Sequence, residues 1–237
     1  MLIYIAGLDG TGELFFKQAP RLARTYRVVT FRSREGSNFG YDELTSDIAQ
    51  IAGELGETRA TIVGESFGGT VALKFALRYP AMVERLVIVN SFPRFRGRKR
   101  IRLANLLAAA APTGLIRPLR VAANLLGLYI DGVTKEDRRR FFEAMRSVER
   151  ESYRRRLQLI SELDIEESLA LIESPVLFVA ARRDIVVPSE REARSMALRI
   201  PNAKVVLVEG AGHACLLGSR VNLAEILENW NPVRGGA

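Results

Sequence analysis

Two glycine-rich stretches carry the residues of this 237-residue sequence that could act together as a base and a nucleophile. The only histidine, His213, lies in VEGAGHACLL, and Ser66 is the central residue of a G-x-S-x-G pattern in VGESFGG. An imidazole titrates near neutral pH, so it can accept and return a proton there. A serine hydroxyl is a weak nucleophile that needs such a base beside it. The two stretches together therefore indicate nucleophilic catalysis by serine.

The sequence around Ser66 strengthens this interpretation. An apolar β-branched run, ATIVG, precedes it, and a segment with helical spacing follows it. A serine at such a strand-to-helix turn is held in a strained conformation that projects its hydroxyl above the sheet. Its neighbours must be small because the strand and the helix pack closely there. The pattern predicts that Ser66 is a nucleophile and not a turn residue.

A histidine base also needs a group that orients it, and an acid is available at the matching position. Asp184 lies in ARRDIVVP, directly after the fifth predicted strand, and His213 follows the sixth. The carboxyl ends of parallel strands meet at one edge of a sheet, where α/β proteins assemble their sites. The alternative for Asp184 is a turn-forming aspartate, and Glu209 and Glu190 are the back-up candidates for the acid.

Six short apolar runs alternate with longer amphipathic segments, which is typical of a parallel sheet covered by helices on both faces. We therefore predict an α/β fold with about six mainly parallel strands flanked by helices. The expected strands are 2–7, 27–31, 60–64, 85–90, 175–181 and 203–209. The expected helices are 14–24, 41–55, 67–78, 189–200 and 214–229.

The alternation stops for some 80 residues between the fourth and fifth strands. This segment is rich in leucine, alanine and arginine with helical spacing, and it predicts four or five helices outside the sheet. The strand pattern resumes afterwards, so we expect an insertion and not a second domain. The expected organisation is a core formed by 1–91 and 170–237, with 92–169 as an inserted helical cap (lid).

The net charge of +8 is concentrated in this cap. Residues 91–160 carry 17 Lys and Arg against 6 Asp and Glu, whereas the rest of the chain carries 18 against 21. A solvated helical face is the simplest interpretation, since arginine favours helices. The alternative is a function: a basic, leucine-rich cap suits an anionic or lipid-like ester and peripheral contact with a lipid surface. Nucleic acid is not an expected partner, because the segment has no recognised binding module and few aromatic residues.

Composition and motifs exclude several other classes. Hydrophobic residues form 48% of the chain and charged residues 26%, as in a globular protein with a substantial core. No apolar stretch approaches the roughly 18 residues of a membrane span, and the first residues have no basic leader, so we expect a cytoplasmic protein. One cysteine, Cys215, allows no internal disulfide, and with a single histidine it allows no Cys/His zinc cluster. Cys215 is expected to be a small buried apolar residue.

We expect no cofactor and no metal. The glycines of AGLDGTG follow the order G-x-x-G-x-G, whereas a dinucleotide-binding loop has G-x-G-x-x-G. The acidic residue that such a site needs after the second strand is also missing, since Arg32 stands there.

With these motifs the chain resembles the α/β-hydrolase superfamily, and in particular its capped serine esterases and lipases. GESFGG matches the nucleophile elbow, ARRDIVVP the acid loop and GAGHACLL the histidine loop. The resemblance implies that Ser66 attacks an acyl carbonyl and that His213 takes the serine proton and later protonates the leaving group. It implies that Asp184 fixes the tautomer of the imidazole.

The resemblance also implies an oxyanion hole made of two backbone amides. One is the amide of Phe67, after the nucleophile, and the other is the amide of Leu8 in the first loop, with Asp9 as the alternative. The commonest family pattern has His-Gly where this chain has Ala-Gly, a change that removes a bracing side chain and not the donor. Glu65, beside the nucleophile, is expected to be a helix-start residue whose charge suits the helix N-terminus.

The expected activity is cleavage of carboxylic esters of lipophilic or medium-chain acyl groups through an acyl-enzyme on Ser66. A thioesterase or an acyltransferase uses the same triad and differs only in the acceptor or leaving group. A non-catalytic binding protein of the same fold is the alternative from another class. The complete set of Ser66, Asp184 and His213 argues against it.

Overall fold

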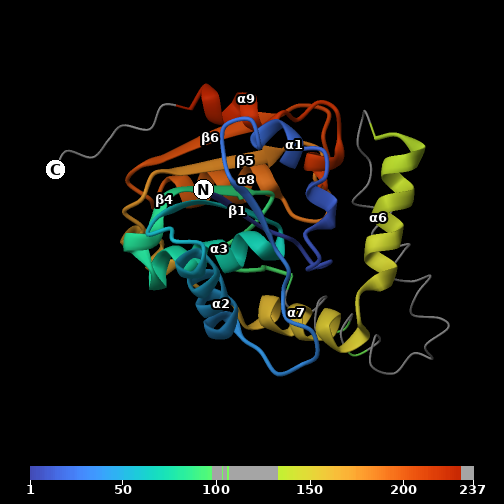
Figure 1. Ribbon diagram of the computed structural model, residues 1–237, viewed down its shortest axis with the longest axis horizontal. Coiled ribbons are helices and arrows are strands. Elements are labelled where there is room, and N and C mark those ends of the chain that lie inside the picture. Colours follow the sequence, from blue (N-terminus) through green and yellow to red (C-terminus); the bar gives the residue numbers. More distant parts are fainter. Residues whose placement is uncertain (98–102, 104–105, 107–132, 231–237) are drawn as a thin grey trace.

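A single sheet of six parallel strands forms the centre of the computed structural model, which describes residues 1–97, 103, 106 and 133–230 (Figure 1). The strand order is β2-β1-β3-β4-β5-β6, which confirms the predicted fold class. All five strand pairs are parallel. The strands are β1 (Leu2–Ile5), β2 (Val28–Phe31), β3 (Ala60–Glu65), β4 (Val83–Val89), β5 (Val176–Ala181) and β6 (Ala203–Val208).

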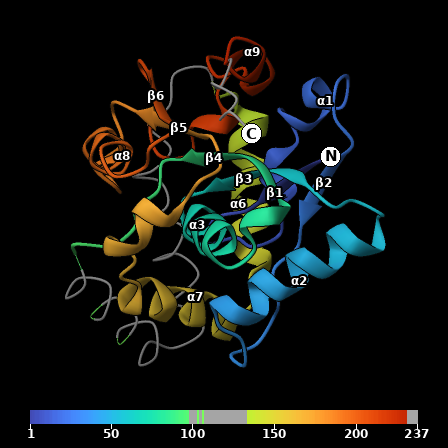
Figure 2. The ribbon, with the colours of Figure 1, turned by 90° about the vertical axis from the view of Figure 1, so that its left-hand side faces the viewer.

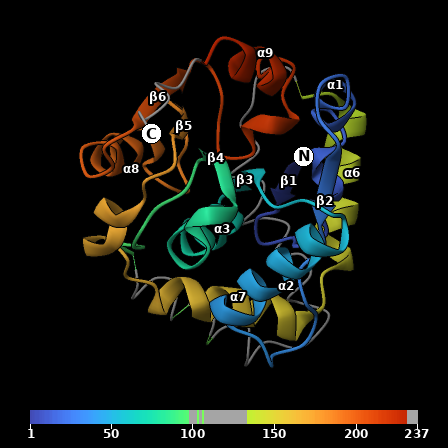
Figure 3. The ribbon, with the colours of Figure 1, turned by 60° about the vertical axis from the view of Figure 1, so that its left-hand side comes forward.

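Helices cover both faces of this sheet, and the alternation of side chains along each strand assigns them to their layers. In β1, Ile3 and Ile5 face one hydrophobic cluster, whereas Leu2 and Tyr4 face the other. Because neighbouring side chains of a strand point to opposite faces, a strand buried on both sides is apolar throughout. Figures 2 and 3 show the two layers on either side of the strands. One layer holds α2 (Tyr41–Glu54), α3 (Phe67–Arg78) and α8 (Ser189–Ala197), and the other holds α1 (Ala19–Leu22) and α9 (Leu223–Glu228).

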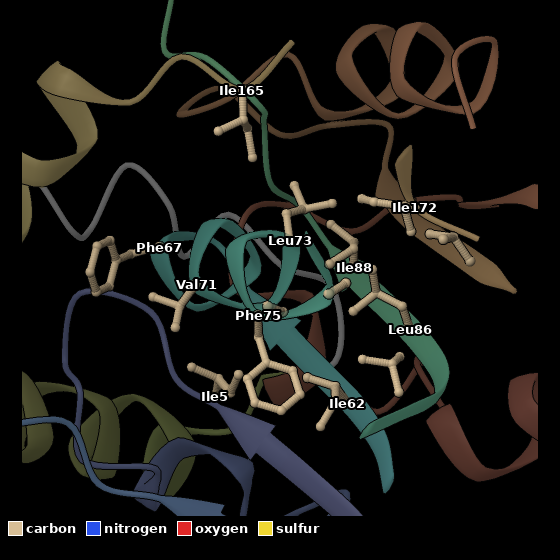
Figure 4. Packing of buried hydrophobic residues seen from close by; sticks show 14 of the residues in the cluster. Ile5, Ile62, Phe67, Val71, Leu73, Phe75, Leu86, Ile88, Ile165 and Ile172 are labelled. Atoms are coloured by element: carbon tan, nitrogen blue, oxygen red, sulfur yellow. The ribbon is translucent and has the colours of Figure 1, made fainter. Parts of the chain in front are cut away.

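Helix α3 is the most deeply packed helix beside the sheet. Phe67 and Phe75 of α3 are almost fully buried, and their neighbours include Ile5 and Ile62 of the sheet (Figure 4). Since α3 begins immediately after Ser66, this packing fixes the end of the helix that carries the predicted nucleophile.

Two predicted helices, 14–24 and 214–229, are each divided in the structure, so the prediction of continuous helices there is wrong. The first becomes η1 (Glu13–Phe15) and α1, and the second becomes η5 (Cys215–Leu217) and α9. The buried side chain of Gln18 explains the second break. It donates hydrogen bonds to the carbonyls of Leu216 (2.8 Å) and Val221 (3.0 Å) and accepts one from the amide of Leu223 (3.0 Å). These main-chain groups bond to a side chain in place of helical partners.

Only part of the predicted cap lies within the described residues. It contains α6 (Lys135–Ser147), α7 (Arg150–Glu162) and η4 (Glu167–Leu171), while the cap helices expected over 98–132 lie, apart from residues 103 and 106, outside the description. Figure 1 shows α6 standing at the carboxyl ends of the strands and α7 below α3. Lys17 of the η1–α1 connection pairs with the buried Asp137 of α6, which ties this helix to the core. No helix in the described parts of the chain is long and apolar enough to cross a membrane.

Candidate active site

The turn between β3 and α3 holds Ser66 in a backbone conformation that side chains rarely adopt. Its φ is 55° and its ψ is −118°, as expected for a strained turn that exposes a nucleophile. The glycines on either side are required by contact with the backbone. A Cβ on Gly68 would lie 2.1 Å from the carbonyl oxygen of Ile5, and one on Gly64 would lie 2.4 Å from that of Gly68.

The three side chains predicted from the sequence form one hydrogen-bonded chain. The Nε2 atom of His213 lies 2.9 Å from Oγ of Ser66, and its Nδ1 lies 2.8 Å from Oδ2 of Asp184. These residues come from the ends of β3, β5 and β6, so the parallel sheet brings together positions that are up to 147 residues apart in the sequence. Serine, imidazole and carboxylate in this order can pass a proton away from the serine hydroxyl.

Asp184 is built to remain an anion. Its side chain is fully buried, and Oδ1 accepts hydrogen bonds from the amides of Val186 (2.9 Å) and Val187 (3.0 Å). Oδ2 is shared by Ser189 and His213. Burial alone would raise the pKa of Asp184, but the charge of His213 and these hydrogen bonds outweigh it and lower the pKa below its ordinary value.

Asp184 in turn favours protonation of the imidazole of His213. Burial would lower the pKa of His213, but the charge and the hydrogen bond of Asp184, with a contribution from Glu65, raise it overall. An imidazolium formed during attack by Ser66 is therefore stabilised where it forms.

The back-up acids lie elsewhere. The carboxylate of Glu209 is 71% exposed and pairs with Arg182, and Glu190 pairs with Arg194 and Arg182. The imidazole of His213 instead contacts Asp184 and Ser66, so the structure brings the first-choice acid to the histidine and leaves the two glutamates paired with arginines.

Glu65 does not start a helix, and the expectation that it does is wrong. It is the last residue of β3, and its Oε2 accepts a hydrogen bond of 2.6 Å from the phenol of Tyr4 in the neighbouring strand. Burial raises the pKa of Glu65 to about 7, while the bond from Tyr4 and the charge of His213 act in the opposite direction. The carboxylate of Glu65 therefore has a partner in β1, and Ser66 separates the residue from the first turn of α3.

One predicted oxyanion donor adjoins the nucleophile, and the loop that carries the other passes beside it. Phe67 follows Ser66 as the first residue of α3, so its amide has no carbonyl of its own helix to bond to. The first loop passes beside the serine as well, since a Cβ on Gly7 would lie 3.4 Å from the Cβ of Ser66. Leu8 and Asp9 continue this loop.

Sequence inspection missed two residues at the end of β4 that brace the site. Asn90 is buried with a positive φ of 46°, and its amide group contacts both the histidine loop and β5. Its Nδ2 donates to the carbonyl of His213 (2.7 Å), and its Oδ1 accepts from the amide of Ala181 (2.8 Å). The next side chain, Ser91, donates to the carbonyl of Ser66 (2.7 Å). The only signal in the sequence was the polar pair Asn90–Ser91 directly after the apolar run LVIV.

The lone cysteine behaves as expected. Cys215 is buried, and its Sγ lies 3.3 Å from Nδ2 of Asn90, behind the site. Burial raises the pKa of this thiol well above its ordinary value, so it remains a neutral packing group. In the described parts of the chain no group of three or more His, Cys, Asp or Glu side chains is placed to hold a metal ion.

Known proteins with a similar sequence are hydrolases by name. A protein of Caulobacter sp. strain K31 named "Putative carbamate hydrolase RutD" is 31% identical over 226 residues, which cover 90% of this chain and 83% of that protein. The protein of the same name from Cronobacter sakazakii is 30% identical over 237 residues, covering 91% and 84%.

Solved structures share the fold at lower identity. The esterase EaEST of Exiguobacterium antarcticum matches with a TM-score of 0.85 and 18% identity, covering 96% of this chain and 90% of that one. The enol-lactonase of Burkholderia xenovorans LB400 matches with a TM-score of 0.76 and 19% identity, covering 90% and 84%. The sequence model of the protein family described as "Alpha/beta hydrolase family" matches residues 2–226 of this chain. Because that match spans almost the whole sequence, the chain belongs to the α/β-hydrolase family.

Proposed function

We propose that this protein is a serine hydrolase that cleaves carboxylic esters through an acyl-enzyme on Ser66. The observation that carries the proposal is the continuous hydrogen-bonded chain from Ser66 through His213 to Asp184. The strained turn that presents Ser66 supports it further.

The reaction has two halves of the same form. Oγ of Ser66 attacks the acyl carbonyl while His213 takes its proton, and the tetrahedral intermediate collapses as His213 gives that proton to the departing alcohol. Water then repeats the attack on the acyl-enzyme, again with His213 as base, and the carboxylic acid leaves. Asp184 holds the imidazole in the tautomer that accepts at Nε2 and stabilises its positive form.

The amides of Phe67 and Leu8 are the proposed donors to the oxyanion in both halves. Leu8 is favoured over Asp9 because it directly follows Gly7, which lies against the nucleophile. The side chain of Asp9 accepts hydrogen bonds from the amide (3.0 Å) and the hydroxyl (2.8 Å) of Thr11.

A lipophilic acyl group suits the surroundings of this site. Leu8 and Ala214, which adjoin the oxyanion loop and the histidine, pack against an apolar cluster from α6 and α7. Its members include Phe141, Met145 and Leu157. This cluster supports the proposed role of 92–169 as a cap, and the exposed arginines of α6 would suit an anionic or lipid-like substrate.

Carbamates are a second candidate substrate class, favoured by the names of the relatives at 30–31% identity. Attack of Ser66 on a carbamate carbonyl passes through the same kind of tetrahedral intermediate and gives a carbamoyl-enzyme, so the same residues would serve.

Labelling with a fluorophosphonate tests the proposal directly. The intact protein is expected to be modified at Ser66 and the Ser66→Ala variant to stay unmodified; a folded protein that does not react would disprove the serine mechanism. Initial rates on nitrophenyl esters of increasing acyl length, their coenzyme A thioesters and matched carbamates then assign the substrate class. The ester proposal requires kcat/KM for a medium-chain ester to exceed that for the thioester and the carbamate.

A further inference from the structure

Arg156 of α7 is a buried arginine that bonds to the main chain of the first loop. It ends the run Arg154–Arg155–Arg156, and only 2% of its surface is exposed, whereas its two neighbours are half-buried. Its Nη1 donates to the carbonyl oxygens of Leu8 (3.0 Å) and Asp9 (3.3 Å). In the described part of the chain this guanidinium forms no ion pair with a carboxylate within 4.0 Å.

Two further contacts hold the loop and the guanidinium in one arrangement. Nη2 of Arg156 donates to the carbonyl of Arg34 (3.2 Å), on the segment that follows β2. Gly10 lies directly against the guanidinium, with a φ of +64°, and a Cβ there would lie 2.4 Å from Cζ of Arg156. The amide of Gly10 closes the turn by donating to the carbonyl of Gly7 (3.1 Å). The arginine therefore occupies a space that only a glycine-containing loop leaves open.

This arrangement is a poor way to stabilise a core. A buried cation bound to neutral carbonyls loses hydration that an apolar side chain of similar volume would not lose. Nε of Arg156 is buried and has no hydrogen-bond partner among the described residues, which adds to the cost. Asp9, Glu35 and Glu149 offset part of the charge from a distance. The specific effect of the guanidinium is to fix the positions of the carbonyls it binds.

We propose that Arg156 is a positioning residue for the oxyanion hole, acting through the main chain of Leu8 and Asp9. The bonds of Arg156 fix the two peptide planes on the C-terminal side of Leu8. The amide of Leu8 shares a peptide plane with the carbonyl of Gly7, which the amide of Gly10 holds, so the turn as a whole sets the position of that amide. The inference rests on the proposed function, because it requires an oxyanion at Ser66. It also links the cap segment to the chemistry, since α7 carries the arginine.

The test compares Arg156→Met with Arg155→Met. Both variants remove a guanidinium from α7, but Arg155 donates to the carbonyl of Phe39 (2.5 Å), away from the first loop. With the best ester from the panel, Arg156→Met is expected to lower kcat about 10- to 100-fold with KM changed less than about threefold, as for a donor that is present but misplaced. Arg155→Met should stay within about twofold of the wild-type protein.

Two further readouts separate positioning from a general structural role. A trifluoromethyl ketone analogue of the ester forms a tetrahedral oxyanion on the serine, and its inhibition constant should weaken by the same factor as kcat/KM falls. The acid limb of the pH profile of kcat/KM should keep its midpoint, because Arg156 does not contact His213. Arg156→Lys, which keeps the charge and most of the volume, covers the case in which the methionine variant does not fold; it should lose about 5- to 20-fold in kcat.

Wild-type kcat in Arg156→Met, or a rise in KM alone, would overturn the proposal. A shift of the acid limb equal to the loss of activity would also overturn it, because the arginine would then act on the imidazole. Failure of the proposed function looks different: the wild-type protein itself would leave esters and the fluorophosphonate untouched.

Discussion

Replacing Asn90 with alanine tests how the site is braced from behind. The change removes the bond from the amide of Ala181 and the bond to the carbonyl of His213, and the weaker contacts of Nδ2 with the carbonyl of Gly212 and Sγ of Cys215 (both 3.3 Å). All of these groups lie where β4, β5 and the histidine loop meet.

The expected cost follows from which groups lose their partners. The amide of Ala181 is left in a buried strand end without an acceptor, which costs about 1–3 kcal/mol, and the lost bond to His213 adds about 1 kcal/mol. The positive φ of residue 90 is harder for alanine than for asparagine or glycine. We expect Asn90→Ala to lower the free energy of unfolding by about 2–4 kcal/mol, and Asn90→Gly to be less destabilising by about 1 kcal/mol because it removes the backbone strain.

Urea unfolding of both variants measures this cost, and ester hydrolysis in buffer measures what it does to the site. Activity in buffer, where the variants are still folded, should fall because the carbonyl of His213 is no longer held. Asn202→Ala is the matched control, because the side-chain amide of Asn202 makes an exposed contact of 3.5 Å with the carbonyl of Glu173. This substitution should change the free energy of unfolding by less than about 0.5 kcal/mol. The reasoning would be refuted if Asn90→Ala lowered the free energy of unfolding by less than about 1 kcal/mol. It would also be refuted if the variant lost the expected stability but kept the kcat of the wild-type protein.

Two further predictions concern the strand and the helix that flank the nucleophile. Burial raises the pKa of Glu65 from an ordinary value of 4.5 to about 7, so between these values the folded protein holds a proton that the unfolded chain has released. Stability should therefore fall as pH rises from 5 to 8, by at most about 3 kcal/mol from this group. Between pH 5 and pH 8 the free energy of unfolding should fall less in Glu65→Gln than in the wild-type protein. Because both proteins keep His213, the difference between them belongs to Glu65. An equal fall in both proteins would contradict the assignment. Gly68→Ala should destabilise the protein by about 3 kcal/mol or more, since its Cβ would meet the backbone of β1. Gly53→Ala should stabilise α2 by about 0.5–1 kcal/mol, because no atom of the described residues would lie within 4 Å of its Cβ. Thermal unfolding should give a lower midpoint than the wild type for Gly68→Ala and a higher one for Gly53→Ala. A Gly68→Ala protein as stable as the wild type would show that the turn around Ser66 can relax.

The sequence by itself determined the architecture of the sheet and the identity of the candidate triad. Strands buried on both faces are continuous apolar runs, so the positions of the six strands along the chain and their approximate ends could be predicted from the pattern. The residues after those ends could then be assigned to one edge of the sheet, and Ser66, Asp184 and His213 do lie within hydrogen-bond distance there.

Only the tertiary structure decided which other side chains support the triad. Asn90, Arg156 and Gln18 each bond to main-chain groups that are between 91 and 205 residues away in the sequence. Such bonds depend on which carbonyls and amides the fold leaves unpaired, and no periodicity records that. For the same reason Arg156 looked like one more charge on a basic cap, and Glu65 looked like a helix cap. Local pattern fixes where chain elements begin and end, whereas the partner of a buried polar group is fixed by elements that meet only after folding.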